Sequence, residues 1–186
     1  MALLDITEKA TGEFVTATEF NKVVDAIKKL QSEKGHAVYF DTEYTESVPQ
    51  VITGTQFVPI SNNMGNKVET YLPYGVDSLY DGTKILPPSL GTGWSAYISF
   101  IAKSSSQNSY FDFGVDIDGT FNEIFKNVEP TIRGSNIYQS YYLPINGYML
   151  DTFLQNGGVP KIKPKSGDTV SLYATTFFIN IGYQQQ

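Results

Sequence analysis

The stretch "SGDTVSLYATTFFINIGY", residues 166–183, decides the fold that the sequence predicts. Its apolar residues alternate with a period of two, in two runs of opposite phase: Val170, Leu172 and Ala174, then Phe177, Ile179, Ile181 and Tyr183. Such alternation predicts a strand with one buried face. The slip at Thr175–Thr176 predicts either a β-bulge or two successive strands.

The same pattern extends outward from this stretch. In "WSAYISFIA", residues 94–102, the alternate positions from Trp94 to Ala102 share one face of a strand. In "SYFDFGVDIDGT", residues 109–120, the alternate positions from Phe111 to Ile117 share one face, and Asp112 and Asp116 are expected on the opposite, solvent-facing side. We count eight to ten strands and no alternation of strands with helices. A short helical turn is expected near 150–156. Residues 36–186 are therefore predicted to form one mainly β domain, an antiparallel jelly roll or β-sandwich.

One helix precedes this domain, in "TATEFNKVVDAIKKLQSEKG", residues 16–35. Thr16 and Glu19 form a capping-box pattern at its start, and Gly35 is a plausible stop. The apolar residues Phe20, Val23, Ile27 and Leu30 follow the spacing of a coiled-coil seam. A helix of about 27 Å is marginal alone in water. The seam packs either on the chain's own β domain or on other copies; its narrowness and terminal position favour an oligomerisation stalk.

Residues 1–15 read as an irregular arm. Leu3, Leu4 and Ile6 give it an apolar tip, which is typical of a peptide that attaches to a larger particle. A frayed terminus is the equally plain alternative.

Composition excludes several classes of function. The chain of 186 residues has 13 Lys and Arg against 19 Asp and Glu, a net charge of −6, so neither nucleic acid nor an anionic membrane is an expected partner. It has no cysteine, which removes disulfides, thiolate catalysis and Cys-ligated metals. We find neither a secretory signal nor a membrane span, and expect synthesis in a host cytoplasm.

The sequence offers little chemistry for an enzyme. His36 is the single histidine and is expected to be a solvated linker residue, so a metal site or a Ser-His-Asp triad is not predicted, nor any cofactor. Asp116, Asp118 and Glu123 are the candidates for a carboxylate-based glycosidase, but the Asp118-Gly119 pair predicts an ordinary hairpin turn. The chain is predicted not to be an enzyme.

Tyrosines on outward positions are the better lead. They are Tyr97, Tyr110, Tyr138, Tyr141 and Tyr142. Exposed tyrosine suits contacts between subunits, and it also suits sugar stacking near the loops 91–94 and 104–108.

Three segments resemble known proteins. The closing stretch 166–183 resembles the last strands of tumour necrosis factor-like jelly rolls. The segment "YQSYYLPINGYMLDTFLQNGG", residues 138–158, is similar to segments of fibre and decoration proteins of tailed bacteriophages, including head fibres of crAss-like phages. The opening "GEFVTATEFNKVVDAIKKLQ", residues 12–31, resembles the helical stalks of such proteins. No receptor-binding or catalytic residue of that family matches a position of this chain.

The resemblance implies a homotrimer with a helical stalk and three jelly rolls around one axis, located in the virion. The face of Phe177, Ile179 and Ile181 is then expected to pack between copies, and the arm to bind a capsid or tail protein. The function predicted is a non-enzymatic structural fibre or spike. The alternative is a glycan- or receptor-binding adhesin that attaches to a host surface.

Overall fold

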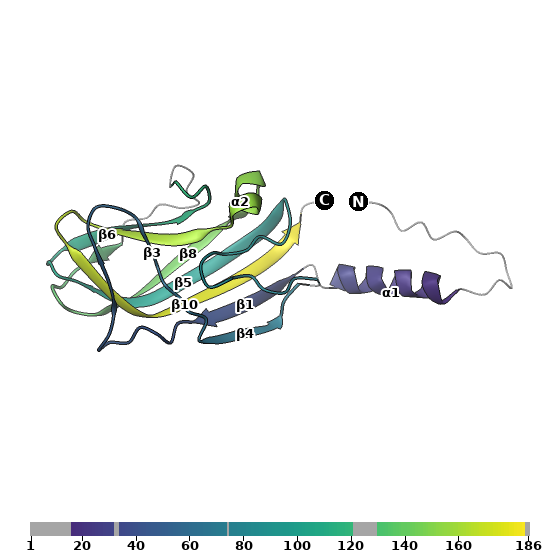
Figure 1. The fold of residues 1–186 in the computed structure, drawn as a ribbon, viewed down its shortest axis with the longest axis horizontal. Coiled ribbons are helices and arrows are strands. Elements are labelled where there is room, and N and C mark those ends of the chain that lie inside the picture. Colours follow the sequence, from purple (N-terminus) through teal and green to yellow (C-terminus); the bar gives the residue numbers. More distant parts are fainter. Residues whose placement is uncertain (1–15, 32–33, 74, 121–129, 185–186) are drawn as a thin grey trace.

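The computed structural model describes residues 16–31, 34–73, 75–120 and 130–184. The predicted arm, with Leu3, Leu4 and Ile6, lies outside the described residues, as does Glu123, and the side chain of Leu30 is also outside them. Two helices and ten strands follow in chain order (Figure 1): α1 Ala17–Gln31, β1 Gly35–Phe40, β2 Gln50–Thr53, β3 Val58–Pro59, β4 Asn66–Tyr71, β5 Thr92–Ser104, β6 Ser109–Asp116, β7 Thr131–Ile132, β8 Gln139–Tyr148, α2 Asp151–Asn156, β9 Val159–Pro164 and β10 Thr169–Gln184.

The strands form two packed antiparallel sheets. The larger sheet has the order β4-β1-β10-β5-β8, with β2 paired to the first part of β10; the smaller sheet has the order β3-β9-β6-β7. The chain crosses between the sheets at most of its connections, so strands distant in sequence become neighbours. This confirms the predicted antiparallel jelly roll with a helix at its N-terminal side.

Large apolar side chains from both inner faces fill the space between the sheets. Ile98 and Phe100 of β5 meet Phe111 and Phe113 of β6, and all four are almost completely buried. The predicted inward faces of β5 and β6 are thus confirmed. Gly35, expected to end the helix, instead begins β1, and α1 ends at Gln31. A side chain at position 35 would collide with the backbone of Tyr71 and Pro73, so the glycine allows this close approach.

A β-bulge joins the two phases of β10 into one strand. The register with β5 shifts between Tyr173 and Thr176, and Ala174 has a positive φ of 54°. The N–H of Asp41 donates to the Thr175 carbonyl at 2.8 Å, and Asn62 Nδ2 donates to the same oxygen at 3.3 Å. The bulge therefore lets the residues before and after it point into one core.

This arrangement corrects one prediction. Phe177, Ile179 and Ile181, expected to pack between copies, are between 0% and 2% exposed inside the core of their own chain. The bulge turns this run inward, so that its face continues the face of Val170 and Leu172. The residues of β10 available to a partner are consequently those of the other phase, such as Tyr173 and Phe178.

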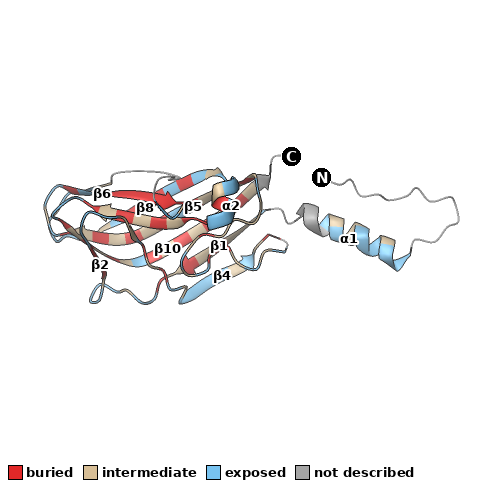
Figure 2. Cartoon of the chain, turned by 45° about the horizontal axis from the view of Figure 1, so that its top comes forward, coloured by how far each residue is buried: buried red, intermediate tan, exposed pale blue. Residues whose placement is uncertain are grey.

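The helix α1 extends beyond one end of the sandwich (Figure 1). The capping box is formed as predicted: Thr16 N–H donates to Glu19 Oε2 at 2.8 Å, and Glu19 N–H donates to Thr16 Oγ1 at 3.2 Å. Phe20 and Ile27 on the predicted seam are 61% and 47% exposed, and Val23 is half-buried. Most of the described surface of α1 is exposed (Figure 2).

The sandwich has two distinct ends. β10 finishes beside Thr92 and close to Gly35, at the end from which α1 extends. It begins beside Thr53 and Ser104, at the opposite end, which we call the far end. The 13 residues of β5 connect the two ends, a span of roughly 40 Å.

Candidate functional site: the outer face of the larger sheet

The outer face of the larger sheet is aromatic and almost without charge. On the strands β1, β10, β5 and β8, none of the described outward positions is Asp or Glu, and Lys103 is the one lysine. Small polar residues such as Ser95, Ser99 and Asn180 separate the rings. A solvated antiparallel sheet normally carries charged residues on its outward positions, and the core of a protein interface is depleted in them.

Four rings form a row across four strands, which we call the aromatic row: Tyr71 of β4, His36 of β1, Phe178 of β10 and Tyr97 of β5. His36 stacks on Tyr71 with ring centroids 5.0 Å apart and on Phe178 at 5.6 Å; Phe178 and Tyr97 are 6.0 Å apart. Strand pairing places them together, because His36 is opposite Tyr71 and Phe178 is opposite Tyr97. His36 is therefore part of a surface and is not the solvated linker residue that we expected.

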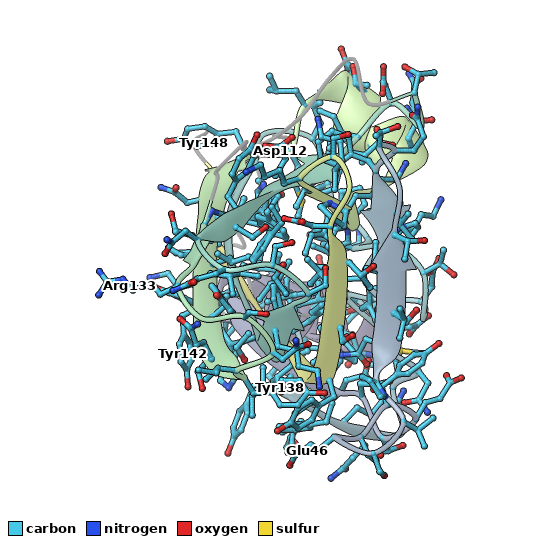
Figure 3. The ribbon with its side chains drawn as sticks, turned by 90° about the vertical axis from the view of Figure 1, so that its left-hand side faces the viewer. Glu46, Asp112, Arg133, Tyr138, Tyr142 and Tyr148 are labelled. Carbon is cyan, nitrogen blue, oxygen red and sulfur yellow. The ribbon has the colours of Figure 1, made fainter. Side chains whose placement is uncertain are left out.

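A second aromatic cluster lies on the same face toward the far end. Tyr138 and Tyr173 meet edge to face at 5.0 Å, and Lys103 Nζ lies 4.5 Å from the centroid of the Tyr138 ring. Tyr138 Oη donates to the Glu46 carbonyl at 3.4 Å, and the two residues lie side by side in Figure 3. Burial, followed by the nearby charge of Glu46, raises the pKa of Tyr173. The charged groups in and beside this cluster are Lys103 and the Glu46 carboxylate.

Between these groups the bulge leaves a hollow of about 230 Å³, lined by Ala174, Thr176 and Tyr142 together with residues of β5. Tyr142 and Tyr148 of β8 are 73% and 52% exposed and project from one side of the sandwich (Figure 3). This face therefore has both a hollow and projecting side chains. A surface of this shape is better suited to contact with another protein than to binding a small ligand.

The outward tyrosines predicted from sequence divide into three groups. Tyr97 and Tyr142 lie on this face, with Tyr138 at its rim, and Tyr110 lies on the smaller sheet. Tyr141 is a correction: it is 9% exposed and packs against Phe100 and Phe111 in the core. The sequence reading missed Tyr71, His36, Phe178 and Tyr173, although the outward phase of each strand already shows aromatic residues where charged ones are usual.

Two of the three acidic residues considered for an enzyme, Asp116 and Asp118, have structural roles. Asp116 is 1% exposed, pairs with Lys161 at 2.5 Å and accepts the N–H groups of Asp118 and Gly119 at 3.2 and 2.9 Å. Asp118 accepts the N–H of Thr120 at 2.9 Å in the same turn. The expectation that Asp112 and Asp116 face open solvent is wrong, because lysines of β9 cover both carboxylates.

The described residues include no group of at least three His, Cys, Asp or Glu side chains placed to hold a metal ion. Within the same ranges, no helix is long and apolar enough to cross a membrane.

Comparison with known proteins gives similarity of shape alone. No family model matches the sequence, and no curated protein matches it. Among solved structures, the Eiger TNF of S. frugiperda is similar over 82% of this chain and 94% of that chain, with 8% identity and a TM-score of 0.47. The vertex protein P5 of PRD1 is similar over 82% of this chain and 73% of that chain, with 11% identity and a TM-score of 0.43.

Proposed function

We propose that this chain is a non-enzymatic structural protein of a virion, a homotrimeric fibre or spike whose N-terminal side is anchored to the particle and whose jelly roll projects from it. The observation that carries the proposal is apolar surface in two places that the chain does not cover itself: the seam of α1 and the outer face of the larger sheet. Other copies of the chain are the partner that fits both.

The seam of α1 supports a helical stalk. Phe20 and Ile27 are exposed in the single chain although they share the face of Val23. Three parallel helices would bury this seam as the core of a coiled coil, and the a/d spacing is the spacing such a core requires. The stalk also adds a stretch of about 1.5 Å per residue between the sandwich and its anchor.

The outer face of the larger sheet supports packing of the jelly rolls against one another. Each chain has a net charge of −6, so most of its surfaces repel a second copy. The aromatic row and its neighbours carry no carboxylate, which lets two such surfaces meet without desolvating a negative charge. Tyrosine gives apolar area with a hydrogen-bonding tip, as interface cores use it.

The anchor is assigned to residues 1–15, with Leu3, Leu4 and Ile6 as the contact to a capsid or tail protein. Their position ahead of the stalk supports this assignment, because it places them at the opposite side of α1 from the sandwich along the chain. The far end of the jelly roll is then the part that projects.

Two measurements test the proposal. Light scattering of the full chain is expected to give three times the 20.6 kDa of one chain; a stable single chain at micromolar concentration would contradict it. Density of purified particles is expected to show the first residues against a capsid or tail protein. Absence of the protein from purified particles would remove the virion assignment.

A further inference from the structure

The outer face of the smaller sheet carries charged pairs that cross from β6 to β9. Asp112 lies directly opposite Lys163, and its Oδ2 is 2.5 Å from Lys163 Nζ. Asp116 Oδ2 is likewise 2.5 Å from Lys161 Nζ. Lys161, Lys163 and Lys165 occupy alternate positions of "KIKPK", residues 161–165, so all three belong to one face.

The third position of this pattern has no carboxylate. Lys165 lies opposite Tyr110: its N–H donates to the Tyr110 carbonyl at 3.2 Å, and its Nζ is 5.7 Å from the centroid of the Tyr110 ring. Lys165 is exposed and forms no ion pair with any residue that the structure describes. Asp168, the nearest acid along the chain, accepts the hydroxyls of Ser106 and Ser109 with its two carboxylate oxygens.

A hollow of about 210 Å³ opens at this position. Its lining includes Tyr110, Asp112, Lys163 and Lys165 and the hydroxyl groups of Thr55 and Ser166. The volume is below the roughly 300–1,000 Å³ of pockets for drug-sized ligands, so it suits one ring of a longer ligand. Tyr110 is 38% exposed, which leaves ring surface available for stacking.

We propose that this hollow binds an acidic saccharide. The sugar ring stacks on Tyr110, and its hydroxyl groups bond to the Asp112 carboxylate and to Thr55 and Ser166. The sugar's carboxylate pairs with Lys165 and supplies the negative charge that β6 lacks at this position. An acidic sugar fits better than a neutral one, because its carboxylate can form the ion pair that Lys165 does not form with any described residue. The nearby Asp168 carboxylate is already bonded to the hydroxyls of Ser106 and Ser109.

The walls of the hollow are held in place before any ligand arrives. The Asp168 N–H donates to the Lys165 carbonyl at 2.9 Å and closes the turn 165–168. The carboxylate of Asp168 then links this turn to the loop between β5 and β6 through Ser106 and to the first residue of β6 through Ser109. Such preorganisation lowers the entropy lost when a ligand binds.

The hollow also lies beside the start of β10, at the far end. All of its lining residues come from one chain, so binding does not depend on a trimer. Only the presentation of the hollow away from the particle, toward a host surface, rests on the proposed spike.

The test is calorimetric titration of the full chain with two acidic probes, a galacturonate tetramer and sialyllactose, each beside its neutral counterpart, a galactose tetramer and lactose. At least one acidic probe is expected to bind about tenfold more tightly than its neutral counterpart. Tyr110→Ala is expected to abolish binding. Lys165→Met is expected to reduce the affinity for the acidic probe to the affinity for its neutral counterpart. Lys103→Met is the matched control, because Lys103 also lies over a tyrosine ring, that of Tyr138, but on the other sheet.

Binding of neither acidic probe would overturn the proposal, as would equal affinity for acidic and neutral probes, or unchanged affinity after Lys165→Met. Lys165 is exposed, so Lys165→Met keeps the test valid even if Tyr110→Ala does not fold. Light scattering of the same samples separates the two hypotheses: a trimer without sugar binding refutes the hollow alone, and sugar binding by a single chain refutes the trimer alone.

Discussion

The two sheets of the sandwich present opposite kinds of outer face. On the smaller sheet, the carboxylates of Asp112 and Asp116 form ion pairs with Lys163 and Lys161 of the same chain. On the larger sheet, Tyr97 and Phe178 lie among small polar residues, and the described outward positions of β1, β10, β5 and β8 hold no acid. The outer face of the larger sheet is therefore the one that the proposed assembly would bury.

The contrast also separates stability from assembly. Substitutions on the smaller sheet are expected to change the free energy of unfolding of one chain. Substitutions on the larger sheet and on α1 are expected to change the association of chains and to leave the fold of each chain intact. The following changes test this division.

The largest effect is expected from the double change Val23→Asp with Ile27→Asp. It places two carboxylates per chain, six in the proposed trimer, in the seam of α1, and uncompensated charges buried there would cost at least about 3–5 kcal/mol. Light scattering is expected to show the mass of one chain. Asn21→Asp with Lys22→Asp adds the same carboxylates at exposed positions off the seam and should keep the trimer. If the double variant still has the mass of the wild-type assembly, the helix does not hold the chains together.

Tyr97→Glu should act next most strongly, through the aromatic row. A carboxylate between Phe178 and the neighbouring copy is expected to weaken association by about 3 kcal/mol, more than a hundredfold in the dissociation constant. Sedimentation over a concentration series measures this, and the melting temperature of the dissociated chain should stay near that of the wild type. Tyr110→Glu puts the same charge on the other sheet and should leave association unchanged; equal effects of both changes would remove the contrast between the faces.

Asp116→Ala is expected to destabilise the single chain by about 3 kcal/mol, because it leaves the Lys161 ammonium without its carboxylate and removes the acceptor of the turn at Asp118 and Gly119. Denaturant unfolding measures the change. Lys67→Ala removes the half-exposed partner of Glu69 and should cost less than about 1 kcal/mol, because the Glu69 carboxylate still accepts the hydroxyls of Tyr39 and Ser78. A similar cost for both would mean that burial does not distinguish these pairs.

The smallest effect is expected from Asp168→Asn, about 1–2 kcal/mol for weakened hydrogen bonds. The Ser106 and Ser109 hydroxyls hold the pKa of the Asp168 carboxyl below its ordinary value of 3.8. A lowered pKa in the folded state means that this stabilisation is present above 3.8 and is lost as the pH falls through the folded pKa. Thermal unfolding should therefore show a constant difference in melting temperature between wild type and variant near neutral pH, and this difference should disappear in acid. A gap that widens in acid would contradict the assigned hydrogen bonds.

Much of the fold could be predicted because local patterns and tertiary packing agree. The Thr16–Glu19 cap, the inward face of β5 and the slip in β10 each depend on residues near in sequence. What the sequence did not reveal was which phase of β10 faces the core: both phases carry aromatic residues, and the choice depends on the partner strands β1 and β5, distant in sequence.

The candidate site was less predictable for the same reason. His36, Phe178 and Tyr97 come from three strands, and their contact follows from antiparallel pairing across the whole chain. Tyr141 was misassigned because Tyr141 and Tyr142 are adjacent aromatic residues, and the strand's neighbours decide which of them points inward.

The bulge at Ala174 also limits how this protein can change over evolutionary time. Between Tyr173 and Thr176, β10 has one residue more than the facing segment of β5. Deleting that residue would give a regular ladder that still keeps Phe177 and Ile179 in the core, but it would remove the bulged carbonyl of Thr175 that accepts from Asp41 and Asn62. Homologous sequences that keep Asp41 and Asn62 should therefore also keep the extra residue, and a one-residue gap at this point in an alignment would mark a lineage whose last strand runs without the bulge.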